Sequence, residues 1–131
     1  MTARTLVRHP DALAVVRLGP GSEVPAWATS STVFSVTATA AETSLVCHAS
    51  TVPPKARRVG PFVAYEVAGP LDFGLTGVLS SLLVPLAEAE VSVFALSTFD
   101  TDWILVRSDA ADRAEAAWVA AGHSVQTEDE R

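Results

Sequence analysis

The chain has 131 residues, of which 49% are hydrophobic and 18% charged. It is long enough for one compact domain or two small modules, and this composition is not that of a disordered chain. The formal net charge of -6 argues against nucleic acid or an anionic membrane as partner, because both need a basic footprint.

The N-terminal residues predict neither a signal peptide nor a membrane anchor. The apolar run after Pro10 is short and is interrupted by Arg17. No apolar stretch in the sequence approaches the roughly 18 uncharged residues of a membrane span. The single cysteine, Cys47, excludes an internal disulfide, so we expect a reducing, cytoplasmic location.

The first half of the chain has the pattern of short strands separated by turns. Residues 12–18 are apolar and β-branched enough for a strand, whereas the prolines of the following segment allow at most a turn near Trp27. Residues 34–39 and 43–49 are expected to pair as a β-hairpin. The segment 52–61 has the proline- and glycine-rich composition of a linker, and we place the module boundary there.

The second half has the pattern of a βαββαβ unit. Residues 62–67 alternate as a half-buried strand does, and an apolar helix follows in which Leu75, Val78, Leu79, Leu82, Leu83 and Leu86 share one face. Either Asp72 or Thr76 is expected to cap this helix. Strands at 91–96 and 103–106, a helix between Ser108 and Gly122, and a short strand at 124–126 complete the order.

This order is that of the ferredoxin-like split unit. The first half shows a similar succession of strands with its helices lost. We therefore predict an α+β fold, with a ferredoxin-like unit at residues 61–131 preceded by a degenerate, strand-rich half at residues 1–58.

Two polar segments flank the first predicted helix and its following strand. The first, LDFGLTG at residues 71–77, places glycines and a carboxylate at a helix start, where unpaired N–H groups favour anions. The second, STFDTD at residues 97–102, places hydroxyls and carboxylates between two apolar strands. We expect the two segments to meet and form a small-molecule site. As simpler interpretations, Asp72 caps the helix, STFDTD is an ordinary hairpin turn, and Phe99 is a packing residue.

The stretch GPLDFGLTGVLSSLLVPLAEAEVSVFALSTFDTDWILV resembles the ACT domains of the CASTOR type, which are small amino-acid-sensing modules. The resemblance implies non-catalytic binding of a free amino acid or similar metabolite, without a cofactor, at an interface between ACT units. The positions that it implies to face the ligand are Asp72, Leu75, Thr76, Gly77, Val78, Ser97, Thr98, Phe99 and Asp102. A full second ACT unit is not evident in residues 1–60, so we expect a homodimer whose output passes through an unknown effector protein.

Two other functions are compatible with the sequence. A structural dimerisation module would pair without any ligand, and a metal-dependent enzyme would use Asp72, Asp100 and Asp102 to hold a divalent cation. Catalysis has little support in the residues, because Cys47 and His48 are adjacent in a predicted strand and point to opposite faces. We therefore expect no catalytic residues and no metal ligands.

Overall fold

The computed structural model describes residues 2–130, which form two compact units. Unit 1 contains the residues up to Pro10 and those from Val63 onward, and unit 2 contains Asp11–Phe62. The chain therefore leaves unit 1 after Pro10, builds unit 2, and returns to unit 1 along the strand β5, Arg57–Val67. The sequence-based division at residues 1–58 and 61–131 differs from these units chiefly in its first ten residues.

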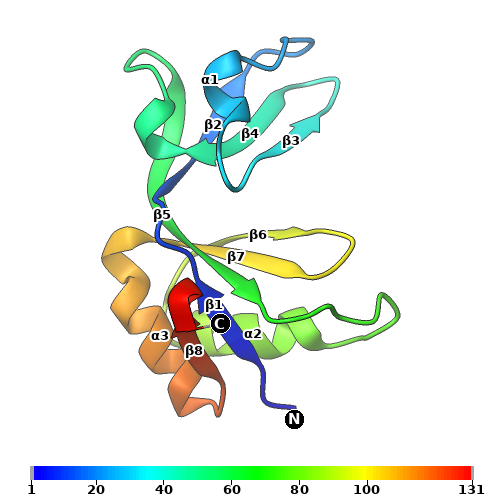
Figure 1. Cartoon of the computed structure of the whole chain (residues 1–131), viewed down its shortest axis with the longest axis vertical. Helices are drawn as coiled ribbons and strands as arrows, with labels where there is room; N and C mark the ends of the chain where they lie inside the picture. The colour runs from blue at the N-terminus through cyan, green and yellow to red at the C-terminus, as the bar shows by residue number, and fades with distance from the viewer. Residues whose placement is uncertain (1, 131) are drawn as a thin grey trace. The chain divides into compact units, whose positions relative to one another are not determined.

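Unit 1 contains the βαββαβ order expected for the second half. Its elements are β1 (Thr5–Arg8), the end of β5, α2 (Val78–Glu88), β6 (Val93–Ser97), β7 (Asp102–Arg107), α3 (Ala111–Ala120) and β8 (Ser124–Thr127), with 3-10 turns η2 (Ser108–Ala110) and η3 (Glu128–Glu130). The strands pair in the order β8-β1-β5-β7-β6 (Figure 1). Without β1, this is the strand order of a ferredoxin-like unit.

The strand β1 was not expected from the sequence. It runs antiparallel to β5, with Leu6 opposite Val67, and parallel to β8, with Leu6 opposite Val125. It thus occupies the place between the first and last strands of the βαββαβ unit. Its four residues are too few to give a periodic pattern, which explains why the sequence did not reveal it.

Unit 2 has the same strand order with very short helices. It contains β2 (Leu13–Leu18), α1 (Ala26–Thr29), β3 (Ser35–Ala38), β4 (Thr43–His48), the 3-10 turn η1 (Ala49–Thr51) and the beginning of β5. The strands are antiparallel in the order β3-β4-β2-β5. This is the order of the split βαββαβ unit, so the predicted α+β class with a degenerate first half is confirmed.

The predicted linker at 52–61 was wrong at its C-terminal end. Residues from Arg57 belong to β5, where Arg57 and Arg58 lie opposite Arg17 and Val16 of β2. Cross-strand pairing provides the backbone partners that proline and glycine content alone did not suggest.

The core of unit 1 lies between its strands and its two long helices. The buried face of α2 presents Val78, Leu82 and Leu86, while α3 contributes the fully buried Trp118. The indole Nε1 of Trp118 donates to the carbonyl of Leu82 at 2.8 Å, which joins the two helices. The Trp118 ring also meets the Tyr65 ring edge-on, with centroids 4.8 Å apart.

A polar network crosses this core at Tyr65. The buried Tyr65 hydroxyl donates to Glu115 Oε2 at 2.5 Å, and Arg8 Nη1 donates to the same oxygen at 2.7 Å. Burial, followed by the hydrogen bond to Glu115, raises the pKa of Tyr65 above its ordinary value. The hydrogen bond that joins β5 to α3 therefore requires the neutral phenol, whereas the ion pair between Arg8 and Glu115 joins β1 to α3 without it.

This network predicts a loss of stability in alkali. In the unfolded chain Tyr65 deprotonates near pH 10, whereas in the folded chain it stays neutral, so higher pH favours unfolding. Above about pH 10 the unfolding free energy should fall by up to about 1.4 kcal/mol per pH unit for this group. Because Tyr65 is the only tyrosine, phenolate absorbance measured alongside urea unfolding reports it directly. Tyr65→Phe should remove this component, and phenolate forming in the folded protein near pH 10 would contradict the account.

Candidate small-molecule site

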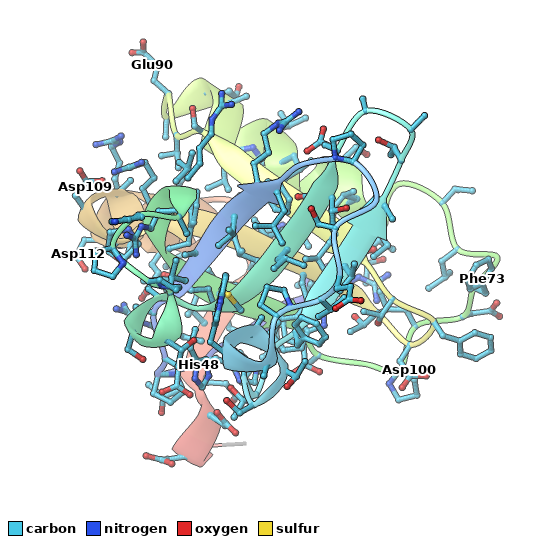
Figure 2. The ribbon with its side chains drawn as sticks, turned by 90° about the horizontal axis from the view of Figure 1, so that it is seen from above. His48, Phe73, Glu90, Asp100, Asp109 and Asp112 are labelled. Atoms are coloured by element: carbon cyan, nitrogen blue, oxygen red, sulfur yellow. The ribbon has the colours of Figure 1, made fainter. Side chains whose placement is uncertain are left out.

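The two polar segments predicted from the sequence lie against each other in unit 1. The backbone N–H of Leu71 donates to the carbonyl of Asp100 at 2.8 Å, and the rings of Phe73 and Phe99 have centroids 5.9 Å apart. Figure 2 shows Phe73 on the loop that precedes α2 and Asp100 on the loop between β6 and β7. Between the loops is an open pocket of about 180 Å³, lined by Leu71, Asp72, Phe73, Leu75, Val78, Ser97, Thr98, Phe99, Asp100, Thr101 and Asp102.

The segment before α2 is a turn, and the helix begins later than expected. Asp72 Oδ1 accepts the N–H of Gly74 at 2.9 Å, and its carbonyl accepts the N–H of Leu75 at 3.0 Å. The helix cap is Gly77, which has a φ of 77° and makes no side-chain capping bond. The prediction that Asp72 or Thr76 caps the helix was therefore wrong, because Asp72 is engaged in its own turn.

The late helix start has two consequences. Leu75 lies outside α2 and is 48% exposed, so it contributes to the pocket rather than to the core face of the helix. The first N–H groups of α2, from Val78, stay without a side-chain cap beside the pocket.

The loop between β6 and β7 is held by a dense set of hydrogen bonds. Thr98 donates its N–H to the Thr101 carbonyl at 2.8 Å, and its Oγ1 donates to the same oxygen at 3.1 Å. The Thr101 side chain is buried, and its Oγ1 donates to the Val67 carbonyl at 2.6 Å. Ser97 Oγ donates to Asp102 Oδ1 at 2.5 Å. One wall of the pocket is therefore fixed to the end of β5.

The nine predicted ligand-facing residues divide between two pockets. Seven of them line the pocket just described, whereas Thr76 and Gly77 line a neighbouring hollow together with Thr2, Arg4, Val78 and Ser81. Leu71, Phe73 and Thr101 also line the pocket and were not predicted to face the ligand, although all three belong to the two polar segments. Asp100 lines it too, whereas the sequence suggested a turn former or a metal ligand at this position.

The pocket is acidic and has an aromatic rim. Its lining contains Asp72, Asp100 and Asp102, and none of the lining residues that the structure describes is basic. Phe73 and Phe99 are 80% and 84% exposed, which is unusual for side chains of this size. Within residues 2–130, no group of three or more His, Cys, Asp or Glu side chains is arranged to hold a metal ion.

Cys47 and His48, the other residues considered for catalysis, lie in unit 2 and do not form a thiol–imidazole pair. Cys47 is buried, and this burial raises the pKa of its thiol. The neighbouring His48 directs its Nε2 toward the N–H and hydroxyl of Thr32, at 3.1 and 3.0 Å. The side chains thus serve local packing and a turn contact.

Two parts of the chain match models of known protein families. The family model of the ACT domain matches residues 61–117, and a model of an N-terminal domain matches residues 11–55. A solved structure of a protein from Agobacterium tumefaciens is 31% identical, with a TM-score of 0.91, and the alignment covers 98% of this chain and 96% of that chain.

More distant structures share the fold. A Vibrio cholerae protein described as of unknown function and a possible transport protein is 14% identical, with a TM-score of 0.75 and coverage of 91% of this chain and 90% of that chain. The regulatory subunit of aspartate kinase from Thermus flavus is 10% identical, with a TM-score of 0.59 and coverage of 92% and 97%.

Residues 61–117 match the ACT-domain family, and the chain as a whole belongs to the same family as the Agobacterium protein. Among the residues that the structure describes, no helix is long and apolar enough to cross a membrane.

The bond between Thr101 and Val67 gives a stability prediction. Thr101→Val keeps the shape of the side chain but leaves the buried Val67 carbonyl without this donor, so it should cost about 1–3 kcal/mol. Thr101→Ser keeps the hydroxyl and should lose clearly less. Urea unfolding of both variants measures the difference, and equal stability of the Val and Ser variants would show that the bond does not hold the loop.

Proposed function

We propose that this protein is a non-catalytic regulatory module of the ACT type that binds a free amino acid in the acidic pocket of unit 1. The observation that supports the proposal most directly is the pairing of a helix start with carboxylates around one small pocket. A zwitterionic amino acid has a carboxylate, which needs N–H donors, and an ammonium group, which needs acceptors. The uncapped first turn of α2 offers the former, and Asp100 and Asp102 offer the latter.

The charge of the pocket narrows the class of amino acid. The lining residues that the structure describes include three aspartates and no basic side chain, so they repel a second carboxylate on the ligand. The exposed rings of Phe73 and Phe99 offer apolar and cation–π contacts to a side chain at the rim. We therefore expect neutral or basic amino acids to bind and aspartate and glutamate to be rejected.

The finer assignments follow the sequence resemblance. We propose that the protein is of the CASTOR type, with the two halves at residues 1–58 and 61–131 as ACT-like units, and that it works in the cytoplasm as a homodimer. The pocket is open and has strongly exposed aromatic side chains, as expected if a neighbouring ACT unit completes it. An effector protein would then respond to the ligand-bound state.

A thermal-shift screen against the twenty amino acids, with a chelator control, tests the proposal. A ligand at 100 times its dissociation constant stabilises by about 2.7 kcal/mol, which should raise Tm by roughly 8 °C in a chain of this size. We expect a neutral or basic amino acid to give this shift and aspartate and glutamate to give none.

Two matched variants locate the site. Asp102→Asn can keep the bond from Ser97 but loses the negative charge, so affinity for the hit should fall roughly 10-fold or more in a calorimetric titration. Asp109→Asn, in η2 outside the pocket, should bind as the natural chain does. If no amino acid raises Tm and the protein is a stable dimer, the structural dimerisation module is favoured. If the chelator lowers Tm, the metal-dependent enzyme is favoured.

A further inference from the structure

The two units of the chain differ in charge. Unit 2 contains four basic and three acidic residues, which gives it a net charge of +1. The whole chain carries -6, so the residues outside unit 2 together carry -7. Exposed basic side chains of unit 2 are therefore the groups through which this acidic chain can attract a carboxylate of another molecule.

Two arginines of unit 2 face the same way without a counter-charge. Arg17 of β2 lies directly opposite Arg57 of β5 in the antiparallel pair, so the two side chains share one face of the sheet with Val59, two residues along β5. All three residues are exposed, Val59 to 54%. Arg17 Nη2 donates to the neutral carbonyl of Ala41 at 3.1 Å, and neither guanidinium forms an ion pair within residues 2–130.

We call Arg17, Arg57 and Val59 the basic patch. Like charges placed directly opposite each other on neighbouring strands repel and destabilise the pair. A carboxylate from another molecule that lies between the two guanidinium groups would remove this repulsion and accept hydrogen bonds from both. The patch is therefore suited to an acidic partner that also offers apolar surface to Val59.

The pocket of unit 1 has a rim of this character. Its exposed lining residues include the rings of Phe73 and Phe99 and the carboxylates of Asp72 and Asp100, which we call the acidic rim. Neither carboxylate forms an ion pair in the described part of the chain. A guanidinium can stack its plane on an aromatic ring while it donates to a carboxylate, and the rim offers both.

Two other groups of exposed carboxylates in unit 1 fit the patch less well. Asp109 and Asp112 share a short segment with Arg107 and Arg113, whose charges oppose theirs. The glutamates of residues 88–90 have no aromatic residue in their segment. The acidic rim therefore complements the basic patch best, because it combines uncompensated negative charge with exposed rings.

We propose that the basic patch of one copy docks on the acidic rim of a second copy. Since every chain carries both surfaces, a two-fold symmetric pair makes the contact twice. Each pocket then receives at its mouth an arginine from the partner, the basic group that its own described lining lacks. This inference rests on the homodimer of the proposed function and assigns the residues through which it forms.

A charge exchange between the two surfaces tests the contact. Arg57→Glu and Asp100→Arg should each weaken the dimer of the full chain by roughly 10-fold or more in sedimentation experiments without ligand, because each places like charges together. The double variant Arg57→Glu/Asp100→Arg restores opposite charges across the contact and should recover most of the loss. Lys55→Glu, Asp109→Arg and their combination make the same changes in net charge outside both surfaces and should show neither loss nor recovery.

Misfolding is distinguished from lost docking by urea unfolding. Arg57→Glu replaces a like-charged pair with an opposite-charged pair beside Arg17, so it should not lower the unfolding free energy of the monomer. A natural chain that stays monomeric at about 100 µM, or a double variant that dimerises no better than the single variants, would overturn the docking contact.

The docking contact and the amino-acid site fail separately. If the charge exchange restores the dimer while no amino acid raises Tm, the contact stands and the ligand proposal falls. If an amino acid raises Tm while the exchange restores nothing, the ligand proposal stands and the contact is wrong.

Discussion

The hydrogen bond from the buried Thr101 hydroxyl to the Val67 carbonyl determines where the candidate site lies. It ties the loop between β6 and β7 to the end of β5, directly before the chain turns toward α2. A second bond, from Leu71 to the Asp100 carbonyl, then brings the segment before α2 onto the same loop. Because these two bonds join the backbones, side chains from the segments 71–78 and 97–102 line the same pocket. Gly69 supports this approach, since a Cβ there would lie 2.9 Å from the Leu71 nitrogen.

The fold of unit 1 gives this site a rigid support. The strands β5 and β7 present buried apolar residues to α2 and α3, and the bond from Trp118 to Leu82 fixes one helix on the other. Phe73 and Phe99 lie at the rim of the pocket, where their side chains are exposed. In the sequence, unit 2 separates β1 from the rest of unit 1. The strand β1 nevertheless belongs to unit 1, because it pairs with both β5 and β8. The N-terminal residues thus complete a unit that the sequence presents as purely C-terminal.

Much of the fold could be predicted because its signals are periodic or compositional. The β3–β4 hairpin, the βαββαβ order and, apart from Leu75, the apolar face of α2 all followed from spacing, and the structure confirms them. The strand β1 and the start of β5 could not be found this way, since one is four residues long and the other contains proline, glycine and two arginines. Their structure comes from cross-strand partners far along the chain, which local patterns do not encode.

The site was partly predictable for a different reason. Residue chemistry singled out the segments 71–77 and 97–102, and the structure brings them together. The helix start was misplaced because Asp72 has the chemistry of a cap but forms a local turn with Gly74, which shifts the cap to Gly77. That shift moved Thr76 and Gly77 into the neighbouring hollow. Binding of an amino acid stays a prediction.

The most direct test of the central claim is an amide NMR titration of the full chain with the amino acid that gives the largest thermal shift. If the two joined segments form the site, the largest saturable shift changes should fall on residues 71–78 and 97–102, with little change in unit 2. Changes confined to other parts of the chain would contradict the account, even if the ligand bound tightly.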